Sequence, residues 1–279
     1  MTAERVSAGW LALREPADAA ARARDLVDEL PRHLQATGRM VIHDLGCGTG
    51  SMGRWLAPLL PGPQRWVLHD RDADLLEAAI ADPPGHAADG SAVTLETRQS
   101  DIDELNYDEF GDATLITASA LLDMLTADEL SSLADLCTAA ACPALLTLSV
   151  VGRVELTPAD ALDRHVAAAF NAHQRRTTPR GALLGPDAPE VASKQLTLRG
   201  AEVLMRSSPW RLGASDTELL VEWFGGWLCA ACEQEPALSA QTDSYKHRRL
   251  EEASTGQLEV TVGHVDLLVL PAASPRSPR

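Results

Sequence analysis

The order of apolar runs and helical segments between residues 40 and 150 constrains the fold more than any other feature of the sequence. Five short runs rich in Val, Ile, Leu and Thr are separated by segments that place apolar residues at helical spacing. Because parallel strands are joined by crossover helices, this alternation predicts a mostly parallel sheet covered on both faces. The predicted strands are "RMVIHDL", "RWVLHD", "AVTLETRQSD", "DATLITAS" and "ALLTLSVV".

The residues on either side of this region predict further helices. The first 39 residues are rich in Ala, Arg and Leu at helical spacing, and Pro16 suits the first turn of a helix. A second helix is predicted over residues 157–176, with Thr157 as its N-cap and Pro158 at its first position.

Two more strands are predicted near the end of the chain, "AEVLMRSS" and "GQLEVTVGHVDLLVL". They bring the predicted number of strands to seven. About forty residues separate these two strands, and the stretch 216–253 between them has helical character. The final segment "PAASPRSPR" is rich in Pro and Ser and predicts a disordered tail.

A glycine-rich loop, "DLGCGTG", joins the first predicted strand to a helix. Such a loop presents free backbone N–H groups and the positive end of a helix, and glycine lets a ligand approach the backbone. Gly46, Gly48 and Gly50 follow the spacing G-x-G-x-G, and Ser51 replaces the third glycine of a dinucleotide-binding loop. The lysine of a phosphate-binding P-loop is missing too. Asp44 would repel a pyrophosphate, so the loop favours a ligand with a positive amino group.

"DLGCGTG" resembles the first motif of the class I S-adenosylmethionine-dependent methyltransferases of the small-molecule type. Three later segments resemble further motifs of this family, in order. In "WVLHDRD" the resemblance implies that Asp70 holds the ribose hydroxyls, with Asp72 as the alternative. In "RQSDIDEL" it implies that Asp101 accepts from the adenine amino group and that Ile102 packs on the ring. "LITASALLDML" resembles the segment that lines the cofactor and the substrate entrance, so the resemblance covers residues 40–150.

The resemblance implies S-adenosylmethionine as the cofactor and methyl transfer as the reaction. Ser119, near the end of the fourth strand, would touch the cofactor, and Arg71 belongs to the second motif. The cofactor-binding residues that the resemblance implies are Asp44, Gly46, Cys47, Gly48, Gly50, Asp70, Arg71, Asp101, Ile102 and Ser119.

A catalytic base is needed only where the methyl acceptor must lose a proton. Asp123 falls where several methyltransferases of this kind carry a His; the alternative is an exposed acid in the first turn of a helix. His165 and His173 lie on the helix after the fifth strand, which commonly borders the acceptor in this fold, with packing or surface roles as the alternative. About 12 Å apart along the helix axis, they cannot share a metal ion.

Two other groups of residues carry alternative roles. The N-terminal helices could close over the cofactor as a lid, and Trp10, Arg14 and Arg22 are the residues of interest in it. Cys229 and Cys232 form a C-x-x-C pair inside a predicted helix, without a second close cysteine pair to complete a zinc site. We interpret them as core residues and predict no bound metal.

Charge and hydropathy limit the classes of partner. The net charge of −16 disfavours contact with a nucleic acid backbone. No run approaches the roughly 20 apolar residues of a membrane span. The N-terminus lacks a basic segment followed by an apolar one, so we expect a cytoplasmic protein. "TASA" follows the fourth strand in place of an N-P-P-Y-type tetrapeptide, which disfavours methylation of a planar amino group.

The sequence therefore predicts an S-adenosylmethionine-dependent methyltransferase that acts on a small-molecule acceptor, by O-methylation, through direct displacement at the sulfonium methyl. N-methylation and C-methylation are left open as alternatives. The roughly forty residues inserted between the last two predicted strands could also form contacts in a homodimer. A non-catalytic scaffold of the same fold is one alternative. A nicotinamide-dependent oxidoreductase is another, and Ser51 in the glycine loop argues against it.

The predicted fold class is α/β. It has a Rossmann-like, seven-stranded, mostly parallel sheet with helices on both faces, an N-terminal helical lid, and a helical insertion between the last two strands. Its predicted divisions are a helical cap over 1–39, a methyltransferase domain over 40–270 with a cofactor half (40–150) and an acceptor half (151–270), and a tail over 271–279.

Overall fold

The computed structural model describes residues 6–34, 38–105 and 107–271 of the chain. Residues 272–279 of the predicted tail and residues 1–5 and 35–37 of the predicted cap lie outside the described residues. The helices are α1 (Ala8–Ala21), α2 (Arg24–Glu29), α3 (Ser51–Leu56), α4 (Ala73–Ala81), α5 (Ala127–Ala139), α6 (Asp163–Gln174), α7 (Ala188–Leu198), α8 (Thr217–Gln234) and α9 (Ser239–Ser254). The strands are β1 (Met40–Leu45), β2 (Gln64–Asp70), β3 (Val93–Gln99), β4 (Leu115–Ser119), β5 (Ala144–Thr157), β6 (Thr177–Thr178), β7 (Gly181–Ala182), β8 (Glu202–Ser207), β9 (Trp210–Leu212) and β10 (Glu259–Leu270).

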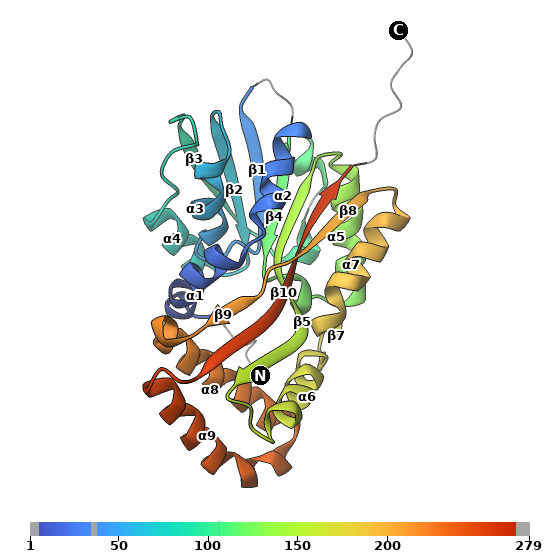
Figure 1. Cartoon of the computed structure of the whole chain (residues 1–279). Helices are drawn as coiled ribbons and strands as arrows, with labels where there is room; N and C mark the ends of the chain where they lie inside the picture. Colours follow the sequence, from blue (N-terminus) through green and yellow to red (C-terminus); the bar gives the residue numbers. More distant parts are fainter. Residues whose placement is uncertain (1–5, 35–37, 106, 272–279) are drawn as a thin grey trace.

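The central sheet follows the strand order β3-β2-β1-β4-β5-β10-β8 (Figure 1). Strands β1 to β5 pair in parallel, whereas β10 lies antiparallel between β5 and β8. The predicted α/β fold, with its mostly parallel sheet and its helical insertion before β10, is therefore confirmed. The structure adds the short strand β9, which pairs with the first half of β10.

Helices cover both faces of the sheet, which explains why every residue of β1 is buried. On one face, α2, α3 and α4 contribute Leu26, Met52 and Leu76 to a core with the sheet. On the other face, α5 and α7 contribute Leu133 and Leu196. The glycine loop between β1 and α3 thus starts from a strand that is fixed on both sides.

A third core lies where β5, β9 and β10 extend beyond the other strands, in the lower half of Figure 1. Helices α6, α8 and α9 cover it, and Phe224, Trp227 and Tyr245 fill its centre. Trp10 and Leu13 of α1 pack against the same core. The N-terminal helix and the insertion before β10 therefore share one packed unit.

Several boundaries differ from the predictions. Helix α1 begins after its N-cap Ser7 and runs through Pro16, which lies inside the helix and not in its first turn. Thr157 is the last residue of β5 and not a helix N-cap, because it pairs with Glu259 of β10. Helix α6 consequently begins only at Asp163. Helix α7 was not predicted.

Candidate functional site

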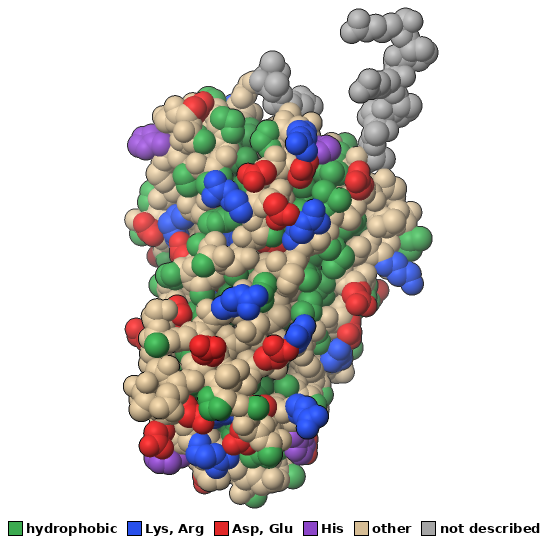
Figure 2. Space-filling model, in the orientation of Figure 1, with side chains coloured by type: hydrophobic (Ala, Val, Ile, Leu, Met, Phe, Trp, Pro, Cys, Tyr) green, Lys and Arg blue, Asp and Glu red, His purple; other side chains and the backbone are tan. Residues whose placement is uncertain are grey.

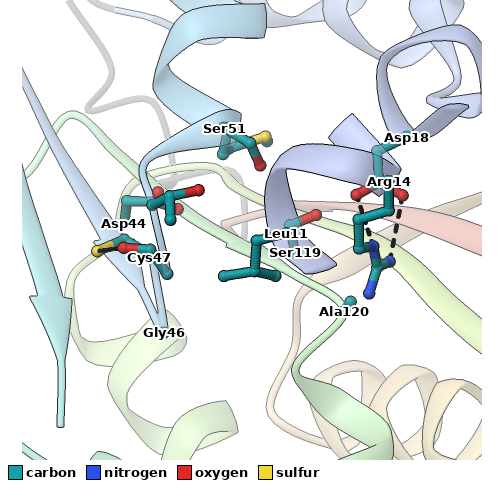
Figure 3. A pocket seen from close by; sticks show the side chains of 12 residues that line it. Leu11, Arg14, Asp18, Asp44, Gly46, Cys47, Ser51, Ser119 and Ala120 are labelled. Carbon is teal, nitrogen blue, oxygen red and sulfur yellow. Dashed lines mark hydrogen bonds and ion pairs between the residues drawn. The ribbon is translucent and has the colours of Figure 1, made fainter. Parts of the chain in front are cut away.

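Two cavities meet where the carboxyl ends of β1, β2 and β4 face helix α1. The small cavity, of about 50 Å³, lies between the glycine loop and α1. All five of Leu11, Arg14, Asp18, Asp44 and Cys47 line it; in Figure 3 Leu11 of α1 lies between the glycine loop and the Arg14–Asp18 pair. The large cavity, of about 220 Å³, continues past the ends of β2 and β3. Gly46, Gly48, Leu11, Arg14, Ser119 and Ala120 line both cavities.

Backbone geometry explains the composition of the loop. Gly46, Gly48 and Gly50 all have positive φ angles, of +61°, +55° and +81°. Side chains rarely adopt this conformation, so the three glycines are required for the turn. A Cβ atom at Gly48 would lie 2.9 Å from the Leu11 side chain. Gly50 is the N-cap of α3 and shapes the loop without lining either cavity.

Asp44 presents a buried carboxylate with one unused oxygen to the small cavity. Its residue is fully buried, and Oδ1 accepts a 2.7 Å hydrogen bond from the Thr117 hydroxyl. Oδ2 has no hydrogen-bond partner among the described residues. Burial raises the pKa of Asp44 to about 7, and the Thr117 hydroxyl and the Arg22 charge oppose this rise. The site therefore holds a buried acid whose charged form a cationic ligand would favour.

Arg22, between α1 and α2, supplies the opposite charge. It is 4% exposed, and its Nη2 donates to Ser119 Oγ at 3.1 Å and to Ser51 Oγ at 3.4 Å. Nε and Nη1 have no partner among the described residues, and burial lowers the pKa of Arg22. No ion pair joins Arg22 to Asp44 within the described ranges. Asp44 lines the small cavity, whereas Arg22 lines neither cavity and lies behind Ser51 and Ser119; both buried groups have unused hydrogen-bonding atoms.

The carboxylate at the end of β2 is tied to the glycine loop. Asp70 Oδ2 accepts a 2.8 Å hydrogen bond from the Gly48 amide, and Oδ1 accepts from the Asp72 amide at 2.9 Å. Asp72 itself caps α4 by accepting from the Asp74 amide. Asp70, Arg71 and Asp72 all line the large cavity.

The segment after β3 forms another wall of the large cavity. Asp101 caps a short 3-10 helix by accepting from the Ile102 amide at 2.7 Å. Ile102 and Leu105 line the cavity beside it. Arg180, in the turn between β6 and β7, reaches the same wall and lies 4.0 Å from Asp101.

Long-range hydrogen bonds hold α1 and α2 over the cavities. Asp266 of β10 accepts from the Ala23 amide at 2.8 Å and from the Leu148 amide at 2.8 Å. Burial raises the pKa of Asp266. Arg54 of α3 donates to Glu15 of α1 at 2.7 Å. The N-terminal helices are therefore fastened both to the last strand and to the helix after the glycine loop.

The three predicted catalytic residues lie outside both cavities. Asp123 follows β4, and burial raises the pKa of its carboxyl to about 6, but its neighbour Met124 lines the large cavity and Asp123 does not. His165 lies 3.0 Å from Glu235, and His173 lies 3.3 Å from Glu233. These pairs join α6 to the end of α8, in the lower part of the molecule. The structure does not bring either histidine to the glycine loop.

Nine of the ten predicted cofactor residues line the two cavities, Gly50 being the exception. The sequence reasoning missed Asp18, Arg180, Trp210 and Asp266. Arg22 was proposed only as part of a lid. No local motif marks these residues; the one signal was an aspartate in the apolar run "HVDLLVL", where a buried carboxylate needs partners.

The surface, the metal-ligating side chains and the helix lengths add three observations. Figure 2 shows acidic and basic side chains interspersed over the visible face. Among the described residues, no three His, Cys, Asp or Glu side chains are placed to hold a metal ion. None of the described helices is both long and apolar enough to cross a membrane.

No protein-family model matches the chain, and no curated protein matches its sequence. Solved structures of similar fold include the cyclopropane synthase MmaA2 from Mycobacterium tuberculosis, with 14% identity and a TM-score of 0.48 over 95% of this chain and 94% of that chain. The magnesium protoporphyrin IX methyltransferase from Synechocystis PCC 6803, with bound SAH, has 17% identity and a TM-score of 0.45 over 75% and 83%. A SAM-dependent methyltransferase from Methanosarcina mazei has 12% identity and a TM-score of 0.47 over 87% and 97%.

At these identities the likeness concerns the fold alone. The strand order with the antiparallel β10, together with the glycine loop after β1, gives the chain the fold of the class I S-adenosylmethionine-dependent methyltransferases.

Proposed function

We propose that the protein binds S-adenosylmethionine and transfers its methyl group to a small-molecule acceptor. The observation that carries this proposal is the pair of buried, opposite and incompletely satisfied charges beside the glycine loop, Asp44 and Arg22. Burying such groups is costly unless a ligand completes their hydrogen bonds. The α-ammonium and α-carboxylate of an amino acid are complementary to these two groups.

The methionine end of the cofactor would lie at the small cavity, which Asp44 lines and which Arg22 adjoins through Ser51 and Ser119. Asp44 Oδ2 would accept from the ammonium group, and Arg22 Nε and Nη1 would donate to the carboxylate. Ser51 and Ser119 hold Arg22 in place through its third nitrogen. A phosphate group does not fit beside Asp44, which disfavours the dinucleotides of a nicotinamide-dependent oxidoreductase.

The adenosine end fits the large cavity. Asp70, fixed by the Gly48 amide, would accept from the ribose hydroxyls. Asp101 would accept from the adenine amino group, with Ile102 against the ring. Leu75 and Leu105 add apolar surface to the same cavity. These assignments follow the order of the chain around the sheet edge, where α/β folds bind nucleotides.

In the proposed reaction the main task of the protein is to align the acceptor with the methyl group of the cofactor. S-adenosylmethionine supplies a methyl group already activated by its sulfonium charge. Residues of this chain hold the two ends of the cofactor, and α1 excludes water above the glycine loop through Leu11. Ala120, with a φ of +52° at the end of β4, places backbone where cofactor and acceptor would meet.

We propose O-methylation of a small acceptor that enters the large cavity. Trp10, Leu121, Met124 and Leu125 give this cavity an apolar wall. A hydroxyl acceptor would need a base, and Asp123, with its raised pKa beside this wall, is the residue to test for that role. The net charge of −16 disfavours nucleic acid as the acceptor.

Transfer of label tests this proposal. The protein would be incubated with S-adenosylmethionine carrying a labelled methyl group and a small-molecule extract, and the products separated by size. We expect label in small molecules, and none with an Asp44→Asn, Arg22→Gln double variant. Folded protein that binds the cofactor without transferring label would favour the scaffold alternative. Binding of nicotinamide dinucleotides instead would favour the oxidoreductase.

A further inference from the structure

Arg14 is held rigidly at the junction of the two cavities. Its Nε and Nη2 donate to the two oxygens of Asp18 at 2.9 and 3.1 Å, and its guanidinium lies 4.9 Å from the centre of the Trp210 ring. Asp18 is fixed in turn by a 2.9 Å hydrogen bond from Trp210 Nε1. Nη1 has no hydrogen-bond partner among the described residues. A side chain anchored in this way is organised in advance to bind a ligand.

Arg180 is anchored in the same manner on another wall of the large cavity. Its Nη1 donates to Glu129 Oε1 at 2.7 Å, and the second oxygen of Glu129 accepts from the Thr126 amide in the capping box of α5. Nε and Nη2 of Arg180 have no hydrogen-bond partner in the described parts of the chain. Its side chain is 33% exposed, which leaves it accessible to a ligand that enters.

In the Arg14–Asp18 and Arg180–Glu129 pairs, the arginine lines the large cavity and its hydrogen-bonded acid does not; Asp101, 4.0 Å from Arg180, lines the cavity as well. The acids that do line it already accept from backbone amides near the proposed adenosine end: Asp70, Asp72 and Asp101. Arg14 and Arg180 therefore offer unused donors next to the apolar wall of Trp10, Leu121, Met124 and Leu125, and Arg71 lines the same cavity.

We propose that the methyl acceptor carries an anionic oxygen group, a carboxylate or a phosphate, attached to an apolar or aromatic body. Arg14 and Arg180 donate to the anion, and the apolar wall packs against the body. Guanidinium donors form strong charge-assisted hydrogen bonds to such oxygens. This inference rests on the proposed function, because it places the acceptor beside the bound cofactor.

Binding of model anions tests this inference. The full chain, saturated with S-adenosylhomocysteine, would be titrated with 3-phenylpropionate, phenyl phosphate and the neutral 3-phenylpropanamide, followed by ligand-observed NMR. We expect at least one anion to bind about tenfold or more tightly than the amide. The comparison of the two anions distinguishes a carboxylate from a phosphate. Binding of S-adenosylhomocysteine, measured first, shows whether the cofactor proposal stands independently.

Variants assign the effect to the arginines. Arg14→Gln and Arg180→Gln should each reduce the preference for the anion about tenfold, whereas Arg176→Gln, on the same segment as Arg180 but outside the cavities, should not. Arg180 lies in an exposed turn, so its variant tests the inference even where Arg14→Gln disturbs Asp18. Equal binding of anions and amide to the parent overturns the proposal. The proposal is also overturned if both variants bind the anions as tightly as the parent does. It is overturned as well if Arg14→Gln loses only its binding of S-adenosylhomocysteine and keeps the parent's preference for the anion.

Discussion

Trp210 Nε1 donates a 2.9 Å hydrogen bond to Asp18 Oδ1, and this bond joins β9 to α1 across 192 positions of the chain. Both residues are buried, at 3% and 4% exposure. The insertion between β8 and β10 thus supports the helix that covers the glycine loop. A segment that carries no cofactor residue of its own thereby contributes to the shape of the cofactor site.

Trp210→Phe should loosen α1 without unfolding the chain. Phe keeps most of the packing but removes the donor to Asp18, which still accepts from Arg14. We expect the free energy of unfolding to fall by about 1–2 kcal/mol. Affinity for S-adenosylhomocysteine should fall several-fold, because α1 covers the site. Urea denaturation measures the change in stability, and calorimetry measures the affinity for S-adenosylhomocysteine. An unchanged affinity would show that the position of α1 does not affect cofactor binding.

Arg22→Gln should weaken binding of the methionine end only. We expect the affinity for S-adenosylhomocysteine to fall about 10- to 100-fold, since a buried charge-assisted pair contributes about 1.5–3 kcal/mol. Affinity for 5′-methylthioadenosine, which lacks the amino and carboxyl groups, should not change. Arg24→Gln, an exposed neighbour, is the matched control. Equal loss for both ligands would place Arg22 elsewhere in the site.

Asp44→Asn should change both binding and the pH dependence of stability. Because burial raises the folded-state pKa of Asp44 to about 7, the folded protein binds more protons than the unfolded chain between about pH 4 and pH 7. Asp44 therefore lowers stability as pH rises through this window. The stability of Asp44→Asn relative to the parent should be higher at about pH 8 than at about pH 5, by urea denaturation.

The same carboxyl links cofactor binding to protons. An ammonium ligand favours ionised Asp44, so binding near pH 7 should release protons, and affinity should increase from about pH 6 to pH 8. Calorimetry in buffers of different ionisation enthalpy counts these protons. Proton release that persists in Asp44→Asn would argue against this role.

Asp70→Asn and Asp72→Asn distinguish the two candidate ribose ligands. Asp70 is fixed by the Gly48 amide, whereas Asp72 caps α4, a role that Asn also fills. We expect Asp70→Asn to weaken both S-adenosylhomocysteine and 5′-methylthioadenosine about tenfold. Asp72→Asn should leave both affinities within about twofold. The reverse result would assign the ribose to Asp72.

The cofactor loop was predictable because its signals are local. Glycines with positive φ angles, an acid at the end of β1 and another at the end of β2 lie within thirty residues, and the strand order brings them together. Parallel strands end at one edge of a sheet, so their terminal side chains converge. The residues that hold α1 and α2 could not be predicted in this way, because Trp210 and Asp266 bind Asp18 and Ala23 from the other end of the chain.

The distance of His165 and His173 from the glycine loop has a physical explanation. The edge that carries the glycine loop lies level with Thr147 of β5, which pairs with Ser119. Strand β5 then continues to Thr157 because β10 pairs with it, and ten further residues of strand span roughly 30 Å. His165 and His173 follow this extension and are carried away from the cofactor edge. The apolar run in the sequence predicted β5 only as far as Val151. The residues after it did not show that β10 pairs with them.

The most direct test of the central claim is calorimetric titration with S-adenosylmethionine and S-adenosylhomocysteine. The parent would be compared with Gly48→Ala and with the control Gly90→Ala, which has a similar φ of +81° but nothing within 4 Å of the added Cβ. Both variants should lose about 1 kcal/mol of stability. We predict binding by the parent and by Gly90→Ala, and its loss in Gly48→Ala, where the Cβ enters the site. Folded parent protein that binds neither ligand would contradict the account.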